Sequence, residues 1–218
     1  QDHKRVGDGD SGPNTGGMGA YSPAPVVTAE VHQRVLDEVI YPTVRGMAEE
    51  GNVYTGFLYA GLMIDKSGAP KVIEFNCRFG DPETQPIMVR LESSLVLLVE
   101  AALAKALDKV EATWDPRPTV GVVLAAGGYP GDYAKGEVIE GLAEAAALDG
   151  KVFHAGTALK DGQVVTSGGR VLCATAIGES VSAAQQQAYR LAEKIRWNGC
   201  FYRKDIGYRA IARERGES

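Results

Sequence analysis

Three polar residues at alternating positions, Glu74, Asn76 and Arg78, are the part of the sequence best suited to chemistry. They lie in the stretch KVIEFNCRFGDPE, residues 71–83, which begins with the alternation of a half-buried strand. Side chains two apart in a strand share a face, so the three would project together. Glu and Asn offer the hard oxygen ligands that Mg²⁺ prefers, and Arg offers a planar fork for phosphate oxygens. The spacing predicts a metal–phosphate site at a strand end.

The other face of this strand is apolar and is predicted to pack: Ile73, Phe75, Cys77 and Phe79. Pro82 cannot donate to a sheet ladder, so the strand should end in a Gly-Asp-Pro-Glu turn. A polar strand face is most often the solvated side of a sheet, and the pattern alone leaves that interpretation open. The match of the three groups to one ligand, a Mg-nucleotide, and two further acids in the turn favour a site.

The composition of the chain limits the classes of function that it could have. The 218 residues are 44% hydrophobic and 23% charged, as in an ordinary globular protein of one large or two small domains. A net charge of −5 argues against nucleic-acid binding. No apolar run approaches the roughly 20 residues of a membrane span, and the start lacks a signal-peptide core. Three widely spaced cysteines indicate a reducing cytoplasm.

The first 25 residues are rich in glycine and proline and are predicted to form one long functional loop. Lys4 and Arg5 fit ligand contacts and solvated surface cations equally well, and His3 beside them is expected on the surface. Four residues offer consecutive free backbone N–H groups, a nest that suits an anion: Asn14, Thr15, Gly16 and Gly17.

The middle of the chain predicts a helix, a hairpin and a second helix. Thr28 should cap the first helix, Pro42 should kink or break it, and Gly51 should end it. The apolar residues 54–64 predict a strand buried on both faces, which pairs through a turn with the polar strand described above. Residues 87–107 predict a helix with a buried apolar side that includes Leu103.

The charged, proline-containing residues 108–118 form the best domain boundary, which gives domains 1–114 and 115–218. In the second domain the sequence predicts strands at 120–126, 152–157, 163–166 and 170–176. It also predicts a hairpin turn at Ser167-Gly168-Gly169 and a helix over 181–197. Its loop at residues 127–133 lacks the spacing of a P-loop and is predicted to be a structural turn. Three cations near the carboxyl end are expected to form docking salt bridges: Arg203, Lys204 and Arg209.

Long strings of this sequence closely resemble the phosphoribosylamine–glycine ligases, a family of ATP-grasp enzymes. The strings are residues 1–25, GFLYAGLMIDKSGAPKVIEFNCRFGDPETQ, GGYPGDYAKGEVI, VFHAGT, VVTSGGRVLCATAIG and FYRKDIGYRAI. The resemblance implies an α+β fold: the C-terminal part of an ATP-grasp domain, an antiparallel sheet with flanking helices, followed by a small β-rich domain. It also implies a cytoplasmic monomer of purine biosynthesis that binds neither nucleic acid nor membrane.

The resemblance further implies a reaction in which ATP phosphorylates glycine and the amine of 5-phosphoribosylamine then displaces the phosphate. Glu74 and Asn76 would hold Mg²⁺ or Mn²⁺ between the ATP phosphates, and Arg78 would contact the transferring phosphoryl group. Glu74 would have to bridge both ions, because the neighbouring strand offers no acid. The acceptor side would include Lys4, Asn14, Thr15, Gly16, Gly17 and Asp81.

Ligases of this family are longer and begin with a nucleotide-binding half that these residues do not encode, so we expect the 218-residue chain alone to be inactive. Two alternatives stay open at this stage. One is another ATP-grasp carboxylate–amine ligase with a different acceptor. The other is a non-catalytic nucleotide-binding or interaction module derived from an ATP-grasp fold.

Overall fold

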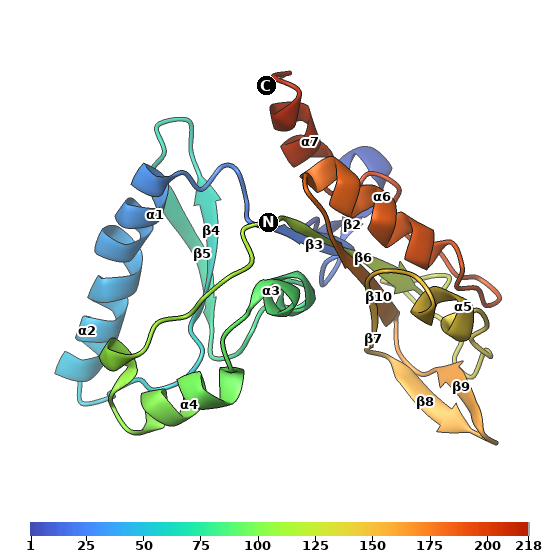
Figure 1. The fold of residues 1–218 in the computed structure, drawn as a ribbon, viewed down its shortest axis with the longest axis horizontal. Coiled ribbons are helices and arrows are strands. Elements are labelled where there is room, and N and C mark those ends of the chain that lie inside the picture. The colour runs from blue at the N-terminus through green and yellow to red at the C-terminus, as the bar shows by residue number, and fades with distance from the viewer. Residues whose placement is uncertain (218) are drawn as a thin grey trace. The chain divides into compact units, whose positions relative to one another are not determined.

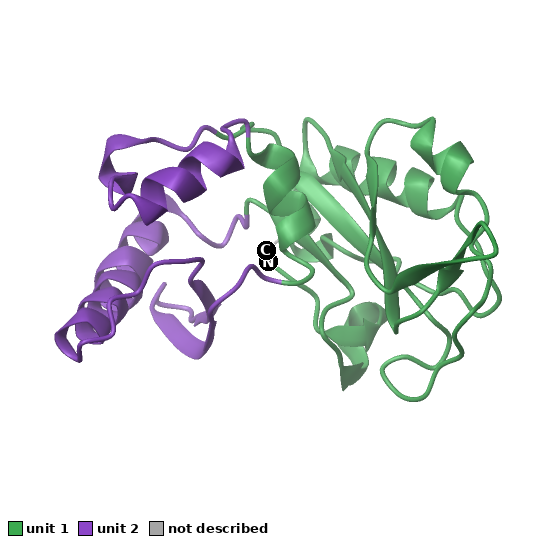
Figure 2. Ribbon diagram, turned by 90° about the horizontal axis from the view of Figure 1, so that it is seen from below, with its two compact units in different colours: residues 1–23, 81–91, 114–218 green, residues 24–80, 92–113 purple. Residues whose placement is uncertain are grey.

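The computed structural model describes residues 1–217 and divides them into two compact units that alternate along the chain (Figure 2). Unit 1 takes residues 1–23, 81–91 and those from 114 onwards, and unit 2 takes residues 24–80 and 92–113. Helices and strands are mixed in the chain, which confirms the predicted α+β class. The boundary between 1–114 and 115–218 stays a prediction.

Unit 1 is built around a four-stranded antiparallel sheet in the order β3-β6-β10-β7 (Figure 1). The two central strands are almost wholly buried, and helices α6 and α3 cover opposite faces of the sheet. The bounds of these elements are β3 Gly19–Ser22, β6 Thr119–Ala125, β7 Lys151–His154, β10 Arg170–Ile177, α3 Thr84–Arg90 and α6 Val181–Ala192.

Smaller elements complete unit 1. They are β1 Arg5–Gly7, the 3-10 turn η1 Asp8–Asp10, β2 Ser11–Asn14, α5 Leu142–Ala146, β8 Thr157–Lys160, β9 Gln163–Thr166 and α7 Tyr208–Glu214. Strands β1 and β2 pair with each other, and β9 pairs with β8. The hairpin turn predicted at residues 167–169 is therefore wrong, because β9 and β10 join different sheets.

The prediction of one long loop over residues 1–25 is also wrong, since three short strands lie there. Strand β3 pairs with β6, and Met18, Ala20 and Tyr21 beside or within it are fully buried. Glycine is depleted in strands, so the glycines of this segment hide its strand signal. Pairing with a strand about a hundred residues later supplies the order that local propensity does not.

One long helical segment dominates unit 2. It consists of α1 Ala29–Val35, the π-helical turn η2 Leu36–Ile40 and α2 Tyr41–Glu49. The Thr28 hydroxyl accepts a hydrogen bond from the Val31 N–H at 3.3 Å, so the predicted cap is confirmed. Pro42 does not break the helix, because it falls in the first turn of α2, directly after the π-helical turn.

The predicted hairpin is present in unit 2 as β4 Tyr59–Ile64 and β5 Pro70–Asn76, which pair antiparallel. Its first strand begins five residues later than predicted, and it is not buried on both faces, since Met63 is 62% exposed. The apolar face of β5 is also open, with Ile73 65% and Phe75 42% exposed.

The single helix predicted over residues 87–107 is divided. Strand-like backbone at Leu91 ends α3, and Ser94 caps α4, which spans Leu95–Leu103 and precedes the 3-10 turn η3 Leu107–Lys109. Leu103, predicted to lie on a buried side, is 71% exposed, and Leu97 is 63% exposed. Unit 2 thus presents apolar side chains on both α4 and β5 that no described residue covers.

These exposures predict an unequal response to core-type substitutions. Ile73→Thr and Leu97→Gln should each change the free energy of unfolding by less than about 1 kcal/mol, because neither side chain is buried. The control Leu124→Ala, at a residue that is 0% exposed, should cost about 2–5 kcal/mol. Urea denaturation of the 218-residue chain measures all three, and a loss above 2 kcal/mol at residue 73 or 97 would show that these faces are covered.

Candidate functional site

Glu74 and Asn76 lie at the end of β5, on the strand that the sequence predicts for them. They alternate with Phe75, so their side chains share one face. Glu74 lies opposite Gly61 of β4, and a Cβ atom at position 61 would come within 3.1 Å of the Glu74 Cγ atom. The glycine therefore leaves room beside the carboxylate.

Arg78 lies beyond the strand, because β5 ends at Asn76. The strand alternation that grouped it with Glu74 does not reach it, and in this respect the prediction is wrong. One Nη1 hydrogen bond of 2.9 Å goes to the Phe79 carbonyl, and the Phe79 ring packs on Phe57 with centroids 3.9 Å apart. In the described part of unit 2 the guanidinium has no carboxylate partner, so its remaining donors are available to phosphate oxygens.

The donor set at the end of β5 fits a divalent cation that also binds phosphates. Among residues 1–217, no group of three or more His, Cys, Asp or Glu side chains could hold a metal ion by itself. Strand β4 contributes no acid next to Glu74. One carboxylate and one amide are nevertheless enough for Mg²⁺, which keeps several waters and takes other ligands from substrate phosphates.

The predicted nest in unit 1 has most of its backbone donors already engaged. The Thr15 N–H donates to the Lys4 carbonyl at 2.7 Å, the Gly16 N–H to the Tyr129 hydroxyl at 3.0 Å, and the Gly17 N–H to the Thr15 hydroxyl at 2.9 Å. Three of the four N–H groups on which the anion prediction rested are thus occupied, at Thr15, Gly16 and Gly17. Any substrate contact of Asn14, Thr15, Gly16 and Gly17 stays a proposal and needs other donors.

Two residues beside this loop were not predicted. Tyr129 comes from the loop over residues 127–133. Its hydroxyl accepts the hydrogen bond from Gly16, which supports the structural role predicted for that loop. Arg170, at the start of β10, forms an ion pair with Asp81, 89 residues earlier, with 2.9 Å between Nη2 and Oδ2. No local pattern in the sequence marks a contact over such a separation.

Lys4 and His3 lie close together but differ in exposure. The Lys4 side chain is 45% exposed, and its Nζ atom lies 2.6 Å from the Asp2 carboxylate. His3 is 1% exposed, so the prediction of a surface position is wrong. Its Nε2 atom accepts a hydrogen bond from the Gly207 N–H at 2.9 Å, and its ring packs near those of Tyr21 and Tyr208.

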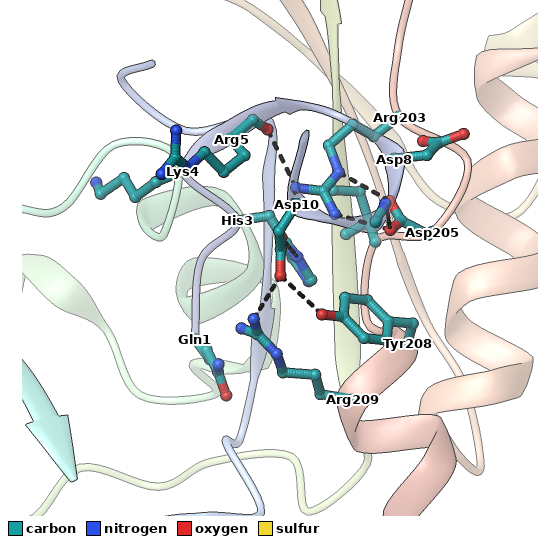
Figure 3. A network of polar contacts seen from close by, with 12 residues as sticks. Gln1, His3, Lys4, Arg5, Asp8, Asp10, Arg203, Asp205, Tyr208 and Arg209 are labelled. Atoms are coloured by element: carbon teal, nitrogen blue, oxygen red, sulfur yellow. Dashed lines mark hydrogen bonds and ion pairs between the residues drawn. The ribbon is translucent and has the colours of Figure 1, made fainter. Parts of the chain in front are cut away.

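A buried guanidinium holds the segment that contains Lys4 (Figure 3). The Arg203 side chain is 0% exposed and donates two hydrogen bonds of 2.8 Å to the Asp205 carboxylate. Its Nη1 atom donates to the Asp10 carboxylate at 3.0 Å and to the Arg5 carbonyl at 3.1 Å. Burial without these acceptors would cost several kcal/mol, so the network fixes residues 5–10 against residues 203–205.

The other predicted docking cations join the same cluster. Arg209 forms an ion pair with Asp10 through its Oδ2 atom, and the Tyr208 hydroxyl donates to the same oxygen at 2.7 Å. Lys204 takes part through its backbone, since its N–H donates to the Asp8 carboxylate at 2.8 Å. The docking role is confirmed for the side chains of Arg203 and Arg209, whereas at position 204 the contact is made by the main chain.

Burial and the neighbouring charges lower the pKa of His3. Burial, with the Arg203 guanidinium as the next cause, lowers the pKa of His3 to about 4 from its ordinary 6.5. The Asp10 and Asp205 carboxylates oppose this shift, and Arg209 adds to it. The folded chain therefore keeps this imidazole neutral at pH 6, where the unfolded chain would protonate most copies.

The fold is that of a known class. The N5-carboxyaminoimidazole ribonucleotide synthetase from Thermotoga maritima matches with a TM-score of 0.56 at 17% identity, over 82% of this chain and 45% of that one. The likeness shows a shared fold. Residues 1–84 match the model of the phosphoribosylglycinamide synthetase ATP-grasp (A) domain, and residues 119–209 match that of its C domain. The chain belongs to the phosphoribosylglycinamide synthetase family.

Individual relatives agree with the family models. The phosphoribosylamine–glycine ligases of Pseudomonas syringae and Pseudomonas putida are 82% and 84% identical, over 100% of this chain and 50% of each protein. The crystal structure of the Thermotoga maritima phosphoribosylamine–glycine ligase matches with a TM-score of 0.79 at 41% identity, over 94% of this chain and 50% of that one. The chain spans about half the length of these relatives. No helix among the described residues is long and apolar enough to cross a membrane.

The buried guanidinium makes a direct stability prediction. Arg203→Met should lower the free energy of unfolding by about 3–5 kcal/mol, because two carboxylates lose their buried partner. The control Arg196→Met removes an exposed pair with Glu140, whose side chains are 66% and 60% exposed, and should cost less than about 1 kcal/mol. Urea denaturation measures both, and equal losses in the two variants would contradict a special role for Arg203.

His3 predicts a pH dependence of stability. Between pH 6.5 and about 4 the unfolded chain binds a proton at His3 that the folded chain does not, so stability should fall as pH falls through this window. The loss should be at most about 3 kcal/mol and should level off below the folded pKa. His3→Gln, which can keep the acceptor for Gly207, should show a shallower decline in chemical denaturation between pH 7 and 4. Identical slopes in both chains would rule His3 out as the source.

Proposed function

We propose that the chain supplies the metal and acceptor side of a phosphoribosylamine–glycine ligase. In this reaction a glycine carboxylate oxygen attacks the γ-phosphorus of ATP, which releases ADP and forms glycyl phosphate. The amine of 5-phosphoribosylamine then attacks the acyl carbon, phosphate leaves, and glycinamide ribonucleotide results. The observation that carries the proposal is the placement of Glu74 and Asn76 on one face of β5, with Glu74 opposite Gly61, in a chain of this family.

The residues of unit 2 suit phosphoryl transfer. Glu74 and Asn76 would hold Mg²⁺ or Mn²⁺, which supplies positive charge between the ATP phosphates when it is bound. Glu74 would serve both ions if two bind, because β4 brings no second acid. Arg78 keeps guanidinium donors free and would contact the transferred phosphoryl group, where charge concentrates in the transition state.

The residues of unit 1 are proposed to bind the acceptor. Lys4 offers an exposed ammonium group, and Asp81 offers a carboxylate whose side chain is 58% exposed. Four loop residues complete this proposal: Asn14, Thr15, Gly16 and Gly17. One observation supports it: Arg203 anchors β1, which pairs with β2 directly before this loop.

The partners we propose are small molecules: glycine, 5-phosphoribosylamine and ATP. The net charge of −5 supports the exclusion of nucleic acid. We further propose that the whole protein acts as a monomer in the cytoplasm, which the free cysteines at positions 77, 173 and 200 support.

The test uses a fusion protein that joins this chain to the part of the Pseudomonas putida relative that it does not cover. The fusion protein should release ADP only when glycine and 5-phosphoribosylamine are both supplied, and the 218-residue chain alone should not. Glu74→Gln should lower kcat/KM at least about 100-fold, because a metal ligand loses its charge.

The matched control is Glu49→Gln, which removes an exposed carboxylate of α2 in the same unit and should leave activity unchanged. A fusion protein with no glycine-dependent ADP release would contradict the proposed function. Full activity of the Glu74→Gln protein would contradict the assignment of the metal ligand.

A further inference from the structure

Arg170 connects two segments outside its own strand, the loop at Gly17 and the turn that begins at Asp81. Its Nη2 atom donates to the Asp81 carboxylate at 2.9 Å, and its Nη1 atom lies 3.1 Å from the Asp81 carbonyl and 3.4 Å from the Gly17 carbonyl. One guanidinium thus binds the turn that begins at Asp81 and the loop at Gly17 together.

Glycine is required where these segments meet. A Cβ atom on Gly16 would lie 2.7 Å from the Arg170 Cζ atom, so a side chain there would displace the guanidinium. Gly17 has φ +123°, which L side chains rarely adopt, and its Cβ would lie 2.4 Å from the Pro82 Cδ atom. Both glycines therefore serve the close approach of the loop to Arg170 and to the turn.

The anchor of this assembly is rigid. Arg170 is the first residue of β10, whose next six residues are buried in the centre of the four-stranded sheet. The loop is held from a second side by the hydrogen bond from the Gly16 N–H to the Tyr129 hydroxyl. The Arg170 guanidinium and the Tyr129 phenol therefore attach the loop to two other parts of unit 1, β10 and the loop over residues 127–133.

The ion pair itself is a weak source of stability. The Asp81 side chain is 58% exposed and that of Arg170 is 21% exposed, and exposed pairs typically contribute about 0–1 kcal/mol. The three contacts of the Arg170 guanidinium are better explained as a means of orienting Asp81 and the loop. A planar guanidinium holds its acceptors in fixed directions, whereas an ammonium group supplies only a charge.

We propose that Arg170 is a positioning residue, which holds Asp81 and the Gly16–Gly17 loop in the conformation that receives the acceptor substrate. The inference rests on the proposed function, because that proposal assigns Asp81 and the two glycines to the acceptor. It adds Arg170 to the proposed residues and predicts which substrate depends on it. Loss of Arg170 should weaken binding of the acceptor substrate and leave binding of the nucleotide unchanged.

Steady-state kinetics of the fusion protein test the direction of effect. Arg170→Met should raise the KM for 5-phosphoribosylamine about tenfold or more while the KM for ATP stays unchanged. Arg170→Lys should recover only part of the loss, because it keeps the charge without the fork. The control Arg190→Met, on the exposed side of α6, should change neither constant. An unchanged KM for the acceptor, or an equal rise in both constants, would overturn the proposal.

Hydrogen exchange of the 218-residue chain tests the positioning separately from the reaction. In Arg170→Met the amides of Gly16 and Gly17 should exchange at least about tenfold faster, while Val122 and Ala174 in the sheet centre stay protected. This result supports the positioning even if the fusion protein is inactive, in which case only the proposed function fails. Unchanged exchange at both glycines, or equal acceleration at Val122, would overturn the positioning.

Discussion

The buried guanidinium of Arg203 is the constraint on which unit 1 depends. A charge that is fully removed from water needs acceptors on every side, and Asp205 alone cannot supply them. Asp10 and the Arg5 carbonyl complete the set, so the first ten residues of the chain must lie against residues 203–205. The first ten residues and residues 203–205 are therefore parts of one folded unit.

The same constraint orders the unit 1 residues that we propose for the acceptor. Once residues 2–10 are fixed, β3 can pair with β6, and the loop between β2 and β3 comes to lie beside Asp81 and Arg170. Within unit 2, the register of a short hairpin sets Glu74 opposite Gly61. Phosphoryl transfer depends mainly on positioning and charge neutralisation, and rigid sheets in both units suit that demand.

Local signals in the sequence predicted several local features correctly. The alternation at Glu74 and Asn76, the cap at Thr28 and the apolar runs of β6 and β10 all depend on neighbours a few residues away. Features set by distant partners were missed or misread. Strand β3, the burial of His3 and the contact of Arg170 with Asp81 arise from residues about 90–200 positions apart, and no periodicity records such contacts. Apolar periodicity also failed to predict the exposure of Leu103. The pattern shows that a helix has an apolar face, but it does not show whether another part of the chain packs against that face.

The assignment of Glu74 and Asn76 to a divalent cation is tested most directly by paramagnetic broadening in the 218-residue chain. With ADP present, substoichiometric Mn²⁺ should broaden the amide NMR signals of Glu74 and Asn76 first and leave those of β8 sharp. The broadening should be absent in the Glu74→Gln chain. Broadening centred on another group of acids, such as Asp8 and Asp10, or an equal effect in the Glu74→Gln chain would contradict the metal assignment.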